Sequence, residues 1–442
     1  MSAFGESVVE QSALAPLRIL ATVAALLMPC AADAELRGHG GPVRALAIGP
    51  DGALAASGSF DGSAILWSLQ RAYALQVLRF HDDAVNAVAF IDASRLATGG
   101  ADGRIAIWRL GAATPDAVLT GHEGPIASLA TSPDGRFLAS GSWDRSVRLW
   151  SLENSSMRVL ALHRDNVNAV AFTPDGGSVV SAGYDSMLLL QPLDPNAAAL
   201  SVMLPAPLNT VVVAPDGEIV AGGADGRLRM LASDGTLRGE MEIEGGVTPI
   251  TALALSRDGW LLAAGGLRGA VVIVDRVARH ALARLVGPGM PVWSLAFAPQ
   301  GSMLYSGGAD RVIREWNARS GEPAQPPLAD PALTARADPG ARGAQVFRAC
   351  EACHAIGPDE GNRAGPTLHG IFGRRIATLP GYRFSEALTR MDIVWNAETI
   401  ARLFEIGPLA YTPGTKMPEQ LITDPGERAA LVEWLARVTR LP

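Results

Sequence analysis

Residues 36 to 317 carry an internal repeat of about 41 residues, and this period constrains the fold more than any other feature of the chain. One series of aspartates has spacings of 41, 42, 41 and 40 residues, and a last member follows after 85, which is two periods. Its members are Asp61, Asp102, Asp144, Asp185, Asp225 and Asp310. A second series, of glycines that close tight turns, gives the same period at Gly52, Gly135, Gly176, Gly217, Gly259 and Gly301. Together the two series predict seven units.

Each unit has the pattern of short β-strands. In the third unit, residues 126–131 are apolar and alternating, and a Pro133-Asp134-Gly135 turn follows. Two more short segments come next, at 137–140 and 147–150. Short strands separated by Pro, Asp and Gly at this period are typical of propeller blades. Because one such unit cannot bury both of its faces alone, we expect the seven units to stack in a ring.

The units resemble WD repeats, a family of propellers with four strands in each blade. The third unit carries the family's Gly-His pair at Gly121-His122 and its tryptophan at Trp150. Other units keep these positions relative to their aspartate, with histidines 21 or 22 residues before it and tryptophans six after it, at His39, His81, His163, Trp67, Trp108 and Trp316. The resemblance implies that each histidine and aspartate belong to a buried hydrogen-bond network. These residues are therefore interpreted as structural, not as catalytic or metal-binding.

The fifth and sixth units depart from the pattern, because neither has the histidine or the final tryptophan. Arg268 holds the aspartate position in the sixth unit, and Gln191 ends the fourth. The seventh unit ends in a proline-rich stretch at 323–327, and proline cannot occupy the interior of a strand. This unit therefore needs an outer strand from elsewhere in the chain. Residues 36–39 match the end of an outer strand at 118–122. We therefore expect the N-terminal segment to supply that strand and to close the ring.

A second motif lies beyond the repeats. Cys350 and Cys353 stand three residues apart, and His354 follows directly. This spacing is that of a c-type haem attachment site, in which two thioethers hold the haem group and the histidine binds the iron. The alternatives are a redox-active pair of thiols and half of a zinc site; the zinc site would need more ligands nearby, and none has the required spacing. The sequence therefore predicts one covalently attached haem c.

Residues 341–442 resemble class I cytochromes c, in particular the mitochondrial and related bacterial soluble type. The resemblance rests on the haem motif, on a first helix predicted at 341–349 and a last at 427–439, and on the methionine loop Tyr411-Thr412-Pro413-Gly414-Thr415-Lys416-Met417. It implies an all-α domain in which Gly343 of the first helix packs on the face of the last helix that carries Leu431 and Trp434.

The resemblance also implies a set of site residues. Met417 would be the second axial ligand with His354, and this ligand pair raises the reduction potential. The carbonyl of Pro366 would accept the axial histidine's N–H and fix its ring. The remaining positions are implied by place in the family pattern alone: Arg374 near a haem propionate, Trp395 as a donor to a propionate, and Thr415 as a hydrogen-bonding residue of the methionine loop.

Several positions depart from the cytochrome pattern. Phe384 and Phe404 stand where the family has tyrosines near a propionate and near the methionine sulfur, and Leu388 replaces a pocket asparagine. Lys416 is the only lysine of the chain, so the ring of lysines that often docks redox partners is missing. We expect weaker electrostatic steering by this domain and contact with partners through the propeller.

The N-terminal residues have the features of a secretory signal peptide. Arg18 precedes an apolar run at 19–28, and Ala32-Asp33-Ala34 fits a cleavage site. The run is half the length of the ~20 residues that a membrane span needs. Cleavage after Ala34 would leave no thiols except those of the haem motif, which suits an oxidising compartment. The net charge of −7 argues against a nucleic-acid partner.

The predicted organisation is thus a signal peptide at 1–34, a seven-bladed all-β propeller at 35–320, a Pro/Ala-rich linker at 321–340 and an all-α cytochrome domain at 341–442. The predicted function is electron transfer in a bacterial periplasm, as a carrier rather than an enzyme. Redox proteins (an oxidase, reductase or dehydrogenase) would be its partners, with a protein docked on the propeller and membrane contact only through partners.

Two alternatives stay open. In one, the propeller holds a second active site fed by the haem, for which His280 is the only propeller histidine outside the repeat pattern. In the other, loss of the methionine ligand makes a peroxidase or gas sensor.

Overall fold

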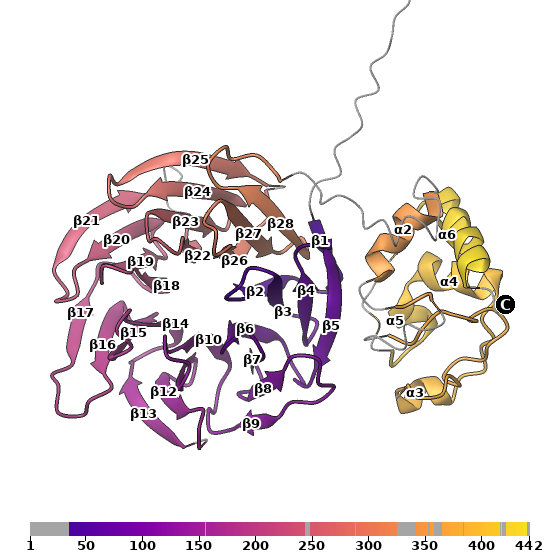
Figure 1. Ribbon diagram of the computed structural model, residues 1–442, viewed down its shortest axis with the longest axis horizontal. Coiled ribbons are helices and arrows are strands. Elements are labelled where there is room, and N and C mark those ends of the chain that lie inside the picture. The colour runs from indigo at the N-terminus through magenta and orange to yellow at the C-terminus, as the bar shows by residue number, and fades with distance from the viewer. Residues whose placement is uncertain are drawn as a thin grey trace, which may run out of the picture. The chain divides into compact units, whose positions relative to one another are not determined.

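The computed structural model describes residues 35–154, 156–243, 248–287, 289–324, 342–351, 354–357, 365–382, 384–415, 417 and 421–439 (Figure 1). The predicted leader at 1–34, most of the predicted linker and Cys353 lie outside these residues. Within the described part, β-strands occupy the sequence from Glu35 to Asn317, and helices follow from Arg342.

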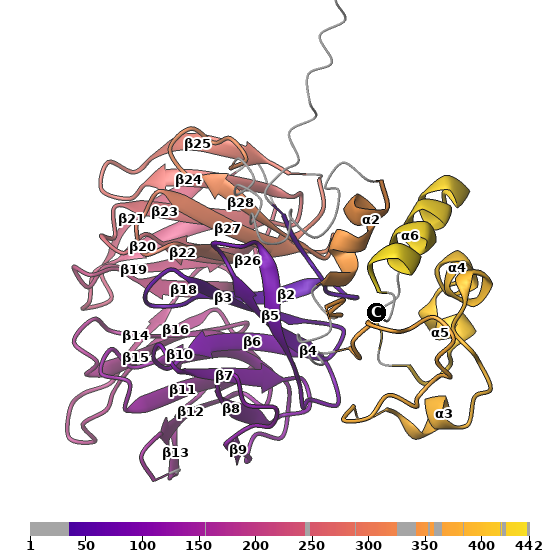
Figure 2. The same cartoon turned by 45° about the vertical axis from the view of Figure 1, so that its right-hand side comes forward.

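Seven four-stranded antiparallel sheets form a ring, as the repeat predicts (Figure 1, Figure 2). In the first six blades the strands pair in sequence order and the first of them lies nearest the ring axis, whereas in the seventh β26 is innermost and β1 is outermost. The first four blades contain β2 Val43–Ile48, β3 Leu54–Ser59, β4 Ser63–Ser68 and β5 Tyr73–Arg79; β6 Val85–Phe90, β7 Arg95–Gly100, β8 Ile105–Arg109 and β9 Ala117–Leu119; β10 Ile126–Thr131, β11 Phe137–Ser142, β12 Ser146–Ser151 and β13 Met157–Leu162; β14 Val167–Phe172, β15 Ser178–Gly183, β16 Met187–Pro192 and β17 Leu200–Met203.

The fifth and sixth blades have the same architecture, although they lack the histidine and the tryptophan. The remaining blades contain β18 Leu208–Val213, β19 Ile219–Gly223, β20 Arg227–Leu231 and β21 Leu237–Glu242; β22 Ile250–Leu255, β23 Leu261–Gly266, β24 Ala270–Asp275 and β25 His280–Val286; β26 Val292–Phe297, β27 Met303–Gly308, β28 Val312–Asn317 and β1 Glu35–Arg37. Period and apolar pattern were therefore sufficient to predict these two blades. His280 lies exposed at the start of the outer strand β25.

Neighbouring blades pack through a repeated glycine contact. A glycine in the second strand of six blades lies against the first residue of the next blade's innermost strand. A Cβ on Gly307 of β27 would lie 2.6 Å from the Val43 side chain of β2, so no larger residue fits there without a shift. The same contact joins Gly58 to Val85, Gly99 to Ile126, Gly141 to Val167, Gly222 to Ile250 and Gly265 to Val292.

The N-terminal strand closes the ring, as predicted. β1 pairs with β28 of the seventh blade, with Glu35 opposite Arg314. Leu36 of β1 is buried in an apolar cluster with Trp67 of the first blade, and Arg314 forms ion pairs with both Glu35 and Asp310. One arginine therefore joins the closing strand to the aspartate of the seventh blade.

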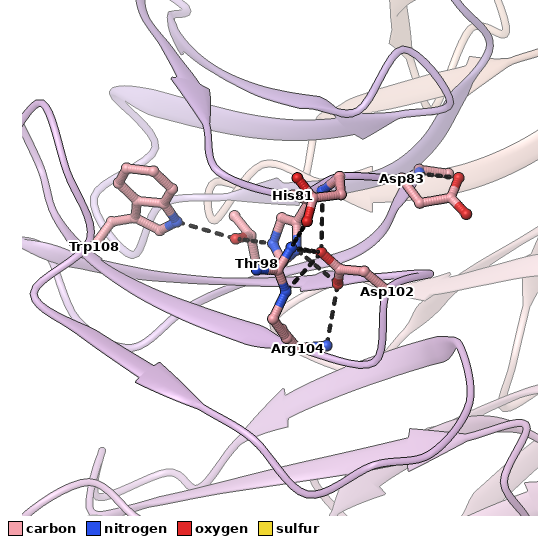
Figure 3. A network of polar contacts seen from close by, with 8 residues as sticks. His81, Asp83, Thr98, Asp102, Arg104 and Trp108 are labelled. Atoms are coloured by element: carbon pink, nitrogen blue, oxygen red, sulfur yellow. Dashed lines mark hydrogen bonds and ion pairs between the residues drawn. The ribbon is translucent and has the colours of Figure 1, made fainter.

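A polar network connects the strands inside each of the first blades, and Figure 3 shows the one in the second blade. The His81 Nδ1 atom lies 3.1 Å from the Asp102 carboxylate, and its Nε2 atom lies 2.9 Å from the Thr98 hydroxyl. The Trp108 indole N–H donates to the same hydroxyl at 3.0 Å. Equivalent contacts join His39 to Asp61, His122 to Asp144 and His163 to Asp185. The predicted hydrogen-bond network of these histidines and aspartates is therefore confirmed.

An arginine makes the corresponding contact in the fifth blade, and another arginine joins the fifth blade to the sixth. In the fifth blade, the Arg229 guanidinium bonds to Asp225 and to Glu240, and its side chain is 1% exposed. Between the fifth and sixth blades, Arg276 bonds to Glu218 at 2.5 Å and to Asp216 at 2.7 Å. Buried guanidinium groups are stable when carboxylates pair with them in this way.

The helices lie in the C-terminal quarter of the chain. They are α2 Arg342–Glu351, α3 Glu386–Thr389, α4 Ala397–Ile406, α5 Pro408–Tyr411 and α6 Pro425–Val438. A Cβ on Gly343 of α2 would lie 2.1 Å from the Ala430 carbonyl and 2.4 Å from Trp434 Cβ, so the predicted close approach of the first and last helices is confirmed. None of the helices in the described part is both long and apolar enough to cross a membrane.

Candidate functional site

Cys350 lies near the end of α2 and belongs to the apolar core of the helical region. It is 6% exposed and packs in one cluster with Phe347, Leu368 and Leu431. The backbone N–H of His354 donates to the Cys350 carbonyl at 3.0 Å. This bond keeps the two residues of the predicted haem motif close together.

The His354 ring is held by the segment that follows it. Its Nδ1 atom lies 2.8 Å from the Pro366 carbonyl oxygen. Because a carbonyl only accepts, Nδ1 carries the proton, and Nε2 is the ring nitrogen suited to a metal. Gly365 lies flat against the ring, where an added Cβ would be 2.3 Å from Cε1 and 2.8 Å from Nε2. A glycine is therefore required beside the imidazole, and the predicted hydrogen bond to Pro366 is present.

The methionine loop positions Met417 on the same core. The Met417 N–H donates to the Thr415 hydroxyl at 3.1 Å, and the Thr415 N–H donates to the Thr412 carbonyl at 3.0 Å. Gly414 has a φ of +81°, which allows the loop to turn tightly. The Met417 side chain is half-buried against the apolar cluster that contains Cys350. The Thr415 hydroxyl therefore accepts a hydrogen bond from the backbone of Met417, the predicted iron ligand.

One cavity of about 170 Å³ brings the predicted site residues together. Its lining includes the described members of the predicted set, which are Cys350, His354, Pro366, Arg374, Trp395, Thr415 and Met417. The rest of the lining is largely aliphatic and aromatic, with Phe347, Ile371, Ile400, Leu403, Leu431 and Leu435 among its residues. An apolar cavity with an imidazole and a thioether on its walls fits a flat, apolar iron porphyrin, because both donors bind haem iron.

Arg374 adds a cation to this cavity. Its guanidinium donates to the Thr367 carbonyl at 2.6 Å and to the His369 carbonyl at 3.2 Å. Burial lowers the pKa of Arg374, and among the described residues no carboxylate lies within ion-pair distance of it. Backbone bonds from Trp395 N–H to the Arg374 carbonyl, and from Gly373 N–H to the Trp395 carbonyl, hold the two predicted propionate contacts side by side. This end of the cavity suits an anionic group of the ligand.

Comparison with known proteins covers both regions. The family model "WD domain, G-beta repeat" matches residues 32–68, 73–109, 113–151, 154–190 and 280–317. Cytochrome c of Cochliobolus lunatus is 37% identical over 100 residues, which are 22% of this chain and 92% of that protein. Cytochrome c2 of Blastochloris viridis is 42% identical over 90 residues, which are 20% of this chain and 70% of that protein. The chain belongs to the cytochrome c family. In this family member, a WD-repeat propeller of seven blades accompanies the cytochrome c homology.

The three departures from the cytochrome c pattern all lie at the cavity. Phe384, Leu388 and Phe404 are lining residues, so apolar side chains occupy this part of the wall. Sequence reasoning missed two polar residues close by, Tyr382 and Ser385, which also line the cavity. Ser385 donates to the Gly414 carbonyl at 2.8 Å and so ties the segment before α3 to the methionine loop. Tyr382 stands two residues before Phe384, whose ring it contacts edge-on.

Proposed function

We propose that this cytochrome c is a periplasmic electron carrier with one covalently attached haem c, and that His354 and Met417 are the axial iron ligands. The observation that carries the proposal is the shared cavity, because both side chains line it and the Pro366 carbonyl orients the imidazole. Similarity to cytochromes c over about a fifth of the chain supports the haem group. An imidazole and a thioether together favour a high reduction potential.

The haem would supply a one-electron change between ferric and ferrous iron. The residues of the chain would prepare the site for that change. Pro366 accepts the Nδ1 proton of His354 and keeps Nε2 in its basic form, while Met417 offers a soft sulfur donor. With both axial positions taken by protein, no position remains for a substrate, which is why we propose a carrier rather than an enzyme.

The walls of the cavity have two further roles in this proposal. Apolar side chains such as Leu403 and Leu431 exclude water from the haem group and lower the local dielectric constant. Arg374 and the Trp395 indole would bind a propionate, and the anion would compensate the guanidinium that burial now disfavours. Thioether bonds from Cys350 and Cys353 would fix the group on the side of α2.

The location and the partners are part of the same proposal. The signal-peptide features of residues 1–34 and the similarity to a bacterial cytochrome c2 support the periplasm. The scarcity of lysine in the helical region favours partner contact through the propeller. We therefore assign docking of a redox protein, an oxidase, reductase or dehydrogenase, to the propeller.

The test is a potentiometric titration of the full chain, produced in a bacterium that matures c-type cytochromes. We expect one haem per chain, covalently bound in a denaturing gel, and a positive midpoint potential. Met417→His should lower the midpoint by more than about 100 mV, since a tenfold change in relative affinity for the two iron states is about 59 mV for one electron. Met391→Leu, which changes another half-buried methionine of the helical region, should leave the potential unaltered.

Two results would overturn this assignment. A midpoint well below zero in the unmodified protein would argue against methionine ligation. An unchanged midpoint in Met417→His would show that another residue binds the iron.

A further inference from the structure

Most buried arginines of the propeller have carboxylate partners. The Arg229 side chain is 1% exposed and pairs with Asp225 and Glu240, and the Arg276 side chain is 6% exposed and pairs with Asp216 and Glu218. In the third blade, the 14% exposed Arg148 side chain lies 3.7 Å from Asp144. Such pairing is the rule, because an unpaired charge removed from water is costly.

The half-buried Arg44 has no such partner among the described residues. It is the second residue of β2, one of the innermost strands around the ring axis (Figure 1). Its guanidinium makes one hydrogen bond in the described structure, a long one of 3.4 Å from Nη1 to the Trp293 carbonyl of β26. No carboxylate of the described residues lies within 4.0 Å of it. Most of its five N–H donors are therefore without a protein acceptor there.

The environment of Arg44 makes this arrangement unfavourable in the isolated chain. The side chain keeps some contact with solvent, yet burial lowers the pKa of Arg44, and no opposite charge offsets that effect. The other arginine whose pKa burial lowers in the same way is Arg374. At Arg374 the proposed haem site supplies an anion, a propionate. By the same physical argument, Arg44 is prepared for an anion that another molecule brings.

The Trp293 carbonyl that accepts from Arg44 belongs to one residue of an aromatic pair. The ring of Phe60, which follows β3 and is 48% exposed, stacks on the half-buried Trp293 ring with 5.3 Å between the ring centres and 28° between the planes. We call Phe60 and Trp293 the turn-face cluster. Exposed apolar groups beside a charged residue are typical of protein-binding surfaces.

We propose that Arg44 and the turn-face cluster form a docking site for an acidic peptide segment of a partner protein. A glutamate or aspartate carboxylate would bind the Arg44 guanidinium, and an apolar neighbour in the peptide would pack on Phe60 and Trp293. This proposal deepens the docking role assigned to the propeller above and rests on it. A peptide is favoured over a nucleic acid because the chain has a net charge of −7, which repels a polyanion but tolerates a single carboxylate.

The first test uses stability without any partner. Replacing Arg44 by methionine removes an uncompensated charge, so the thermal midpoint of the full-length holoprotein should stay the same or rise. Arg148→Met is the matched control, because that arginine is paired with Asp144, and its midpoint should fall. If Arg44→Met lowers the midpoint as much as Arg148→Met, Arg44 serves the fold through the Trp293 carbonyl and the proposal is wrong.

The second test measures recognition directly. The probe is a fluorescein-labelled octapeptide with two glutamates beside a phenylalanine, and its control has glutamines in place of the glutamates. The full-length holoprotein should bind the acidic peptide at least about tenfold more tightly than the control. Arg44→Gln should lose that preference, and Arg44→Lys should keep most of it.

Several outcomes would overturn the proposal. They are no binding of the acidic peptide at millimolar concentration, equal binding of both peptides, and capture of a single-stranded oligonucleotide instead. The potentiometric midpoint of Arg44→Gln should equal that of the unmodified protein. Failure of the peptide test with a normal midpoint would therefore reject this site alone, whereas an abnormal midpoint in the unmodified protein would reject the proposed electron carrier.

Discussion

The first four blades and blades five and seven differ in the side chain that bridges the repeated aspartate to a neighbouring strand. In the first four it is a histidine, and in blades five and seven it is an arginine four residues after the aspartate, Arg229 and Arg314. The imidazole and the guanidinium occupy the same place. A Cβ on Gly100 of the second blade would lie 2.4 Å from the His81 ring, and one on Gly223 of the fifth would lie 2.8 Å from the Arg229 guanidinium.

This comparison shows what a blade requires at that position. The aspartate must have a buried donor that bridges strands, but the donor can reach it from different parts of the sequence. The histidine comes from the turn before the innermost strand, and the arginine comes from the third strand. A blade can therefore lose the family's histidine and keep its fold, provided that another donor satisfies the carboxylate.

Among the variants that test whether arginine replaces the histidine, Arg229→Met should lower the stability most. The change leaves Asp225 and Glu240 without their shared cation. Removing one partner from a buried pair costs about 3–5 kcal/mol, and since both carboxylates keep some solvent contact we expect roughly 3 kcal/mol of lost unfolding free energy. Urea denaturation followed by tryptophan fluorescence measures it.

Arg227→Met is the control for that experiment. Arg227 lies two residues earlier and contacts Glu240 and Glu242, but its side chain is 45% exposed. An exposed pair contributes about 0–1 kcal/mol, so this variant should be close to the unmodified protein. Equal losses in the two variants would mean that Arg229 does not replace the histidine network.

A smaller difference is expected between the third and seventh blades, in the stability that the serine of the second strand contributes. Ser140 accepts from the Trp150 indole at 2.8 Å and also contacts His122 at 2.7 Å, whereas Ser306 contacts Trp316 in the described structure of the seventh blade. Ser140→Ala leaves two buried groups without a partner and should cost roughly 2 kcal/mol. Ser306→Ala leaves one and should cost about 1 kcal/mol.

Thermal unfolding of the two serine variants, each compared with the unmodified protein, measures this difference. A loss for Ser306→Ala that equals or exceeds that of Ser140→Ala would show that the histidine adds nothing to the link between serine and tryptophan. The comparison between the two kinds of blade would then rest on the aspartate contacts alone.

Much of the propeller could be predicted from the sequence, because its determinants are local and periodic. The aspartate and glycine series located all seven blades, and the match between residues 36–39 and 118–122 predicted the closing strand β1. The arginine contacts were missed, although a signal existed. Arg148, Arg229 and Arg314 each stand four residues after a repeated aspartate.

Other features have no local signal. The stacking of Phe60 on Trp293 joins the first blade to the seventh, and only ring closure brings them together. At the candidate haem site, His354, Pro366 and Met417 could be predicted because they belong to motifs. Tyr382 and Ser385 could not, because their place at the cavity depends on how an irregular segment between two motifs folds.

The smallest expected effect concerns pH, because an imidazole titrates near neutrality and a guanidinium does not. Burial lowers the pKa of His122 more than Asp144 raises it, and the same holds for His81 beside Asp102. The folded protein therefore binds a proton on these rings less readily than the unfolded chain. As the pH falls below about 6.5, the unfolded state gains protons that the folded state does not, and stability decreases.

The repeated aspartates add a second step at lower pH. Burial acts to raise the pKa of Asp144, but hydrogen bonds from Ser146 and His122 outweigh it and hold the pKa at about 2. The stability from Asp144 is complete above the ordinary aspartate pKa and is lost as the pH falls toward 2. In the fifth blade only this second kind of step is expected, because Arg229 stays charged throughout: burial acts to lower its pKa, but Asp225 and Glu240 raise it overall.

Hydrogen exchange at pH 7 and pH 5, corrected for the intrinsic exchange rate, measures the difference. Strands β7 and β11 should lose protection on acidification, because protonation of the imidazoles that contact Thr98 and Ser140 weakens these two strands. Strand β19 should keep its protection, because in the described part of the fifth blade an arginine pairs with the repeated aspartate. Uniform loss of protection across all three strands would mean that the ring unfolds as one unit. The partner of each aspartate would then set the stability of the whole propeller rather than that of its own blade.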